Sequence, residues 1–107
     1  MEREKTAAVV LAAGKGTRMQ SDVPKQYLLL GGRPVIYYAL KAFQDSFVDE
    51  LILVVEPGEE DKCRRQIVEQ YGFTKVKAVT AGGTERYDSV MNGLKQVSED
   101  CAYVFIH

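Results

Sequence analysis

The sequence has no marked excess of charge of either sign, few cysteines and no long apolar segment. Its 107 residues include 14 Lys and Arg against 15 Asp and Glu, which gives a net charge of −1. Because an extended basic surface needs a clear excess of cations, we expect no nucleic-acid partner. The apolar residues 7–13 are too few to span a membrane, and both acids and bases precede them. They predict neither a membrane anchor nor a signal peptide.

The two cysteines, Cys63 and Cys101, stand apart from each other, without a CxxC pair or a neighbouring histidine. This spacing indicates neither a zinc site nor a disulfide framework. We therefore expect reduced thiols, no metal ligands within this sequence and a cytoplasmic location.

Four short apolar runs recur along the chain, at residues 7–12, 51–55, 76–80 and 102–106. Each is almost continuously hydrophobic, which is typical of strands covered on both faces, and helical periodicity fills the gaps between them. The pattern predicts an α/β fold with a mainly parallel sheet. Since no linker, repeat or low-complexity tract interrupts it, we expect one domain over residues 1–107.

Helices are expected in the gaps between the runs. The first begins at about Pro34, and the second extends from about Glu59 to Tyr71, where Gly72 ends it. The third extends from about Thr84 or Glu85 to Val97. Its apolar residues recur at three- and four-residue steps and predict packing through Tyr87, Val90, Met91, Leu94 and Val97.

A glycine-containing loop follows the first apolar run and carries the main functional signal. Residues 11–19 (LAAGKGTRM) hold Gly14 and Gly16, and the cations nearby include Arg18 and Lys25. Glycines let the backbone turn sharply and direct N–H groups at an anion, while cations balance its charge. The loop predicts a site for a nucleotide polyphosphate. An ordinary strand-to-helix turn, which needs no ligand, is the simpler alternative.

Two other phosphate-binding patterns do not fit this loop. The dinucleotide fingerprint GxGxxG has Met19 in place of its third glycine. Its ribose-binding acid is expected about twenty residues later, and the acid after the second apolar run, Glu56, lies much further along. The Walker pattern GxxxxGK[ST] is absent as well. Neither a nicotinamide or flavin site nor a P-loop site is therefore expected.

Taken together, the motifs resemble a known family. The patterns LAAGxGxRM, PKQY and, at residues 82–94, GGxxRxxSVxxGL are similar to those of the 2-C-methyl-D-erythritol 4-phosphate cytidylyltransferases. The resemblance implies a Rossmann-like three-layer α/β/α nucleotidyltransferase fold, of which this sequence holds the N-terminal half, with about four strands. It implies transfer of CMP from CTP to 2-C-methyl-D-erythritol 4-phosphate, with release of pyrophosphate, in non-mevalonate isoprenoid biosynthesis.

The same resemblance assigns roles to individual residues. Arg18 and Lys25 match catalytic cations that stabilise the α-phosphate and the departing pyrophosphate. The residues implied to bind CTP are the loop glycines and those around the cytosine: Ala12, Ala13, Gly14, Gly16, Gly83, Thr84 and Ser89. Thr84 departs from the acid often found there, which matters little if its contact is through the main chain. Without the resemblance, Ser89 also fits a helix-surface serine, and Arg86 fits a solvated side chain.

The resemblance also implies Mg²⁺ and partners. The aspartate expected to bind Mg²⁺ would follow His107, so His107 itself is interpreted as a strand-end residue. The acceptor-substrate site and the arm that forms a homodimer would lie in the second half of the family sequence. We therefore expect a CTP-binding half with little or no turnover alone.

Two alternatives stay open. Ribitol-5-phosphate and other sugar-phosphate cytidylyltransferases share the loop and the PKQ segment, so these motifs do not fix the acceptor. The other alternative is a non-catalytic nucleotide-binding fragment or interaction module. In such a module, the apolar last strand, residues 103–106, would recruit a second copy or another chain through an exposed edge.

Overall fold

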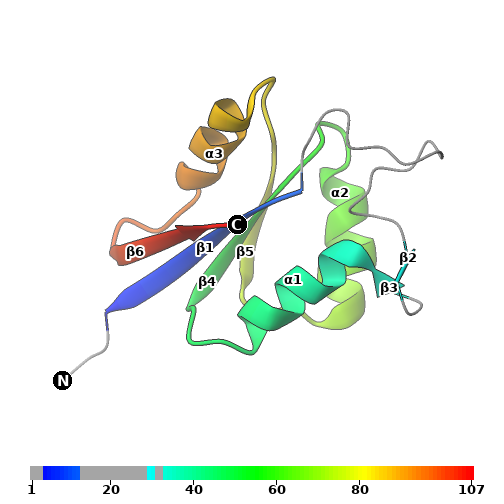
Figure 1. The fold of residues 1–107 in the computed structure, drawn as a ribbon, viewed down its shortest axis with the longest axis horizontal. Helices are drawn as coiled ribbons and strands as arrows, with labels where there is room; N and C mark the ends of the chain where they lie inside the picture. The colour runs from blue at the N-terminus through cyan, green and yellow to red at the C-terminus, as the bar shows by residue number, and fades with distance from the viewer. Residues whose placement is uncertain (1–3, 13–28, 31–32) are drawn as a thin grey trace.

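A four-stranded parallel sheet forms the centre of the computed structural model, which describes residues 4–12, 29–30 and 33–107 (Figure 1). In spatial order its strands are β5 (Val76–Ala81), β4 (Glu50–Val55), β1 (Lys5–Leu11) and β6 (Cys101–Ile106). A separate short sheet pairs β2 (Leu29–Leu30) with β3 (Arg33–Pro34) in antiparallel register. The four strands predicted from the apolar runs are confirmed, and so is their parallel pairing.

Helices cover both faces of the parallel sheet. On one face lie α1 (Val35–Gln44) and a helix that begins as α2 (Glu60–Cys63) and continues as the π-helical η2 (Arg64–Glu69). On the other face lies α3 (Arg86–Leu94) (Figure 1). The three-layer α/β/α arrangement is therefore confirmed. None of the helices in the described ranges has the length and apolarity that crossing a membrane requires.

The central strands β1 and β4 send alternate side chains into the two helical layers. Towards α1 and α2 they direct Ala8, Val10, Leu51, Leu53 and Val55, and towards α3 they direct Val9, Ile52 and Val54. All of these side chains are at most 3% exposed. Coverage on both faces explains why these two strands have continuous apolar sequences, as predicted.

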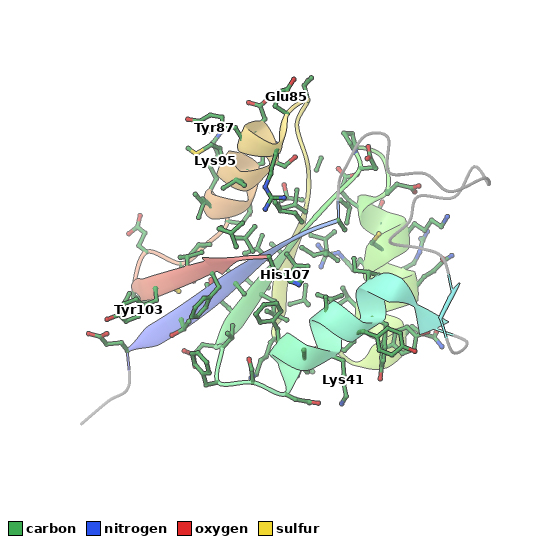
Figure 2. All side chains as sticks on the ribbon, viewed as in Figure 1. Lys41, Glu85, Tyr87, Lys95, Tyr103 and His107 are labelled. Atoms are coloured by element: carbon green, nitrogen blue, oxygen red, sulfur yellow. The ribbon has the colours of Figure 1, made fainter. Side chains whose placement is uncertain are left out.

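The edge strand β6 is less covered than its apolar sequence predicts. Tyr103 and Phe105 are 60% and 45% exposed, because in the described part of the chain β6 has one neighbouring strand, β1. Phe105 meets Phe47 of the α1–β4 connection edge-on, with the ring centroids 6.0 Å apart. Figure 2 shows Tyr103 at the outer side of the sheet. The exposed apolar surface expected here is present, and recruitment of another chain by it stays a prediction.

Two helices begin or continue differently from their sequence patterns. α1 begins at Val35, one position later than expected, since Pro34 pairs with Leu29 in the short sheet. The second helix changes to π geometry after Cys63, which its periodicity does not indicate. Its residues Cys63, Ile67 and Val68 are buried. Gly72 follows the helix with a φ of 68°, the left-handed conformation that glycine adopts without strain.

The prediction that large apolar residues of the third helix pack on the sheet is wrong for three of the five residues named. Tyr87, Met91 and Leu94 are 71%, 37% and 36% exposed. Figure 2 shows Tyr87 on the outer side of the helix, away from the strands. These three side chains therefore face outwards, whereas Val97, just after the helix, packs against the core as predicted.

The face of α3 on the sheet carries small residues instead. Ser89 and Gly93 are buried there. A Cβ atom on Gly93 would lie 2.5 Å from Cγ1 of Val9 and 3.0 Å from Cγ2 of Val54, which is closer than side chains pack. Because Gly93 has no Cβ, the helix backbone approaches β1 and β4 directly.

A buried carboxylate joins several elements at the amino-terminal edge of the sheet. Glu50 of β4 is 6% exposed and accepts hydrogen bonds from the Ser98 main-chain N–H and hydroxyl, both at 2.9 Å. The Nζ atoms of Lys5 and Lys77 lie 3.2 and 3.8 Å from its oxygens. Burial by itself raises the pKa of Glu50, but the bonds from Ser98 and Lys5 outweigh it and hold that pKa below its ordinary value.

Glu50→Gln is expected to destabilise the fold by about 1–3 kcal/mol, because an amide group then faces donors that had bonded to a carboxylate. Since the pKa of Glu50 is lowered by folding, its stabilisation is present above the unfolded-state pKa. It is lost as the pH falls through the folded-state value. Urea unfolding at a series of pH values checks this. Below about pH 4.5, the ordinary value for glutamate, the wild type should lose more stability than the variant.

Asp45→Asn is the matched control, because the Asp45 carboxylate is exposed and pairs with Lys41 one helical turn away. Such surface pairs contribute about 0.3–0.5 kcal/mol. If Glu50→Gln unfolds with the same pH dependence as the wild type, the role assigned to the Glu50 carboxylate is wrong.

Gly93→Ala is expected to destabilise the chain by about 1–3 kcal/mol through overpacking against Val9 and Val54. The sign of this stability change is informative, since alanine in an exposed helix is favoured over glycine by about 1 kcal/mol. Thermal or urea unfolding measures the change. Lys95→Ala, an exposed position just after α3, should shift stability by no more than about 0.5 kcal/mol. A Gly93→Ala variant more stable than the wild type would refute the close contact.

Candidate functional site

Two of the predicted base-binding segments meet at the carboxyl-terminal end of β4. The Ala12 N–H donates to the Val54 carbonyl, and the Gly82 N–H donates to the Val55 carbonyl, each at 2.7 Å. Ala12, which is 1% exposed, therefore follows β1 on one side of β4, and Gly82 follows β5 on the other. The carboxyl-terminal edge is where open parallel sheets bind ligands. The predicted residues thus come together where a ligand is expected.

The segment between β5 and α3, residues 82–85, is referred to below as the 82–85 loop. The Gly83 N–H donates to Oγ of Ser89 at 3.1 Å, and the Glu85 N–H donates to Oδ2 of Asp88 at 3.2 Å. A Cβ atom on Gly83 would overlap Cβ of Asp88. Glycine is therefore required where the loop passes the first turn of α3, and side chains of that turn fix the loop at two points.

Ser89 is a buried residue of this site. It is 3% exposed, so the alternative interpretation as a helix-surface serine is wrong. Its Oγ accepts the bond from Gly83, and a hydroxyl that accepts one bond keeps its own hydrogen for donation. Ser89 can therefore fix the loop and donate to a further acceptor at the same time. Its contact with a base stays a prediction.

The remaining predicted residues divide into exposed ones and ones that lie outside the described ranges. Thr84 is exposed in the 82–85 loop, and Arg86 is exposed at the start of α3, in agreement with a solvated side chain. The loop residues Ala13, Gly14, Gly16, Arg18 and Lys25 lie outside the described residues. Their roles stay predictions.

His107 lies at the same edge of the sheet, beyond β6. Its N–H donates to the Val9 carbonyl at 2.9 Å, and its carbonyl accepts from the Leu11 N–H at 3.0 Å. The His107 ring meets that of Phe43 edge-on, with a centroid distance of 5.6 Å. These are the contacts of a strand-end residue, as the sequence predicts.

The described residues do not offer a set of metal ligands. Within residues 4–12, 29–30 and 33–107, no three His, Cys, Asp or Glu side chains gather as a metal site. Mg²⁺ is held through carboxylate and phosphate oxygens. The carboxylate nearest to Gly83, that of Asp88, instead accepts the Glu85 N–H. Among the side chains that the structure describes, none thus forms a ligand set for Mg²⁺.

Both cysteines are free thiols in the structure. Cys63 is buried beneath the second helix, and Cys101 begins β6. Burial, together with the nearby Glu50 carboxylate, raises the pKa of the Cys101 thiol. It is therefore a poor nucleophile at neutral pH.

Asn92 contacts the residue just before the 82–85 loop, although no sequence motif indicates it. Its Nδ2 donates to the Ala81 carbonyl at 3.0 Å, at the last residue of β5. Ser89, Asn92 and Gly93 are related by three- and four-residue steps, so they share one side of α3. Ser89 and Gly93 are specified positions of the motif at residues 82–94, whereas Asn92 occupies an unspecified one.

The chain is similar to known proteins over nearly its whole length. The family model described as IspD, 2-C-methyl-D-erythritol 4-phosphate cytidylyltransferase, matches residues 6–107. A protein of that name from Lachnoclostridium phytofermentans is 51% identical over 104 residues, which are 97% of this chain and 44% of the relative. The chain thus spans less than half the length of this curated relative.

Solved structures share the fold. The 4-diphosphocytidyl-2C-methyl-D-erythritol synthase of Anaerococcus prevotii has a TM-score of 0.76 and 30% identity, covering 97% of this chain and 42% of that one. The inositol-1-phosphate CTP transferase of T. maritima has a TM-score of 0.72 over 92% of this chain and 42% of that one. At 22% identity this second likeness concerns the fold alone. The nucleotidyltransferase fold expected from the motifs is confirmed.

Ser89→Ala is expected to release the 82–85 loop. Without the hydroxyl, hydrogen exchange of the Gly83 amide should become about three- to tenfold faster, and stability should fall by about 0.5–1.5 kcal/mol. Exchange followed by NMR, together with urea unfolding, measures both effects. Ser46→Ala is the matched control, because the Ser46 hydroxyl bonds the main chain of Phe43 and Val48 on the opposite layer. The assignment fails if Gly83 exchanges equally fast in the wild type and in Ser89→Ala.

Proposed function

The chain belongs to the 2-C-methyl-D-erythritol 4-phosphate cytidylyltransferase family, and we propose that it is the CTP-binding part of such an enzyme. The complete reaction transfers CMP from CTP to 2-C-methyl-D-erythritol 4-phosphate and releases pyrophosphate. The observation that carries the proposal is the grouping of Ala12, Gly83 and Ser89 at the carboxyl-terminal edge of the sheet. Under this proposal residues 1–107 act as one nucleotide-binding unit in the cytoplasm.

The cytosine is proposed to bind between Ala12 and the 82–85 loop. The main chain of Gly83 and Thr84 lies in an exposed loop, and the Ser89 hydroxyl keeps a hydrogen to donate, so the edge of a base would find polar partners there. The exocyclic amine of cytosine would donate to a main-chain carbonyl. Uracil has an oxygen at that position and would leave two acceptors facing each other. The site should therefore prefer CTP to UTP.

The triphosphate is proposed to lie along the glycine-containing loop. Main-chain N–H groups at Gly14 and Gly16 would contact phosphate oxygens, and Arg18 and Lys25 would balance their charge. An oxygen of the acceptor phosphate attacks the α-phosphorus, and the bond to the bridging β-phosphate oxygen breaks, so pyrophosphate leaves with the electron pair. Alignment and charge neutralisation account for most of the acceleration in such transfers. Mg²⁺, when bound, supplies further positive charge to the phosphates.

The acceptor site and the homodimer contacts are proposed to lie in the part of the family sequence outside the match. The support is that this chain covers 44% of the relative from L. phytofermentans. The chain alone should then bind CTP but release little pyrophosphate when it is given acceptor and Mg²⁺.

Arg18→Ala and Lys25→Ala are each expected to weaken CTP binding about 10- to 100-fold, because each removes a charged contact to phosphate. Isothermal titration of the purified chain with CTP and Mg²⁺ measures the dissociation constant. In a complete enzyme the same substitutions should lower kcat by about 10²- to 10³-fold.

Lys62→Ala provides the control for net charge, since Lys62 is an exposed cation in the last turn of α2. It should leave the affinity for CTP unchanged. The proposal is refuted if the wild-type chain shows no saturable CTP binding, or if Lys62→Ala weakens binding as much as Arg18→Ala does.

A further inference from the structure

Hydrogen bonds hold three consecutive residues at the end of β5. The Ala81 carbonyl accepts from Asn92 Nδ2 at 3.0 Å, the Gly82 N–H donates to the Val55 carbonyl at 2.7 Å, and the Gly83 N–H donates to Ser89 Oγ at 3.1 Å. The middle bond comes from the sheet, and the outer two come from side chains of α3. The path of the backbone into the 82–85 loop is therefore set jointly by β4 and α3.

The direction of the Ala81 carbonyl explains why it needs a side-chain partner. Successive residues of a strand point their main-chain groups to opposite sides. Since the Gly82 N–H points to β4, the Ala81 carbonyl points away from it, towards the side where β5 has no neighbouring strand among the described residues. Asn92 supplies a donor at this place.

Asn92 is itself held in a fixed position. It lies between Ser89, which is buried at 3% exposure, and Gly93, which brings the α3 backbone against Val9 and Val54. The side chain is partly buried and begins from a helix backbone that packs closely on the sheet. A short amide on so fixed a backbone is well suited to hold a neighbouring carbonyl in place.

We infer that Asn92 is a positioning residue for recognition of the base. By holding the Ala81 carbonyl, it determines where the main chain of Gly83 is presented, and it acts through the loop without touching the ligand. This inference rests on the proposed function of the 82–85 loop in binding the cytosine of CTP. Under this inference Asn92 belongs to the site as a residue that affects the choice between bases.

Gln44 offers a matched control at the other end of the same strand. Its Oε1 accepts the Lys75 N–H at 3.0 Å, just before β5 begins. Gln44→Ala therefore removes a side-chain amide bond to the main chain, as Asn92→Ala does, but far from the loop. Asn92→Asp is a second variant that keeps the shape of the side chain and replaces the donating nitrogen by oxygen.

The experiment compares the wild-type chain with these three variants in two measurements. The first is hydrogen exchange at the Gly83 amide without nucleotide, and the second is the affinity for CTP and for UTP by isothermal titration. Asn92→Ala and Asn92→Asp should accelerate Gly83 exchange about three- to tenfold and lower the CTP-to-UTP affinity ratio by a similar factor. Gln44→Ala should change neither. If Asn92→Ala does not fold, Asn92→Asp decides the outcome.

Two results would overturn the inference: Gly83 exchange unchanged in the Asn92 variants, or equal losses of CTP and UTP affinity that leave their ratio as in the wild type. If the wild-type chain binds neither nucleotide, it is the proposed function that fails. In that case faster Gly83 exchange in the Asn92 variants still supports the positioning of the loop, and unchanged exchange refutes it.

Discussion

The geometry of the candidate site depends on the contact that Gly93 makes with the sheet. Because Gly93 has no Cβ, the backbone of α3 lies directly on Val9 and Val54. One helical turn earlier, this closeness brings Ser89 within 3.1 Å of the Gly83 N–H. A larger residue at Gly93 would lift the helix, and the 82–85 loop would lose its partner. A packing contact in the core thus controls the position of main-chain groups at the surface.

The strands could be predicted from sequence, and their exposure could not. Val9 and Ile52 belong to runs that are apolar at every position, because helices cover both faces of β1 and β4. The run that forms β6 has the same appearance, yet Tyr103 is 60% exposed. The apolar composition of a segment indicates its tendency to be buried. It does not indicate how many neighbouring strands the segment has, because that number depends on the order of strands in the sheet.

The packing face of α3 was predicted wrongly for a related reason. Helical periodicity assigns the largest apolar residues to the core, since burial of apolar area is the main driving force. At Gly93 the close approach of the helix backbone to the Val9 and Val54 side chains decides instead, so Tyr87 and Met91 remain outside. The family motif locates Gly83 and Ser89, whereas Asn92 carries no such signal. Its partner is a main-chain carbonyl, which is defined only once β5 and α3 are in place.

The charged cluster that stabilises the fold and the proposed ligand site lie at opposite edges of the sheet. At the amino-terminal edge, Lys5 and Lys77 pair with Glu50. The five residue steps from Glu50 to Val55, at about 3.3 Å each, place this cluster about 17 Å from the carboxyl-terminal edge. At the effective dielectric constant of about 20 that suits protein sites, two unit charges this far apart interact by about 1 kcal/mol. Because Lys5 and Lys77 offset the Glu50 charge within the cluster, the cluster has little effect on a ligand at the far edge.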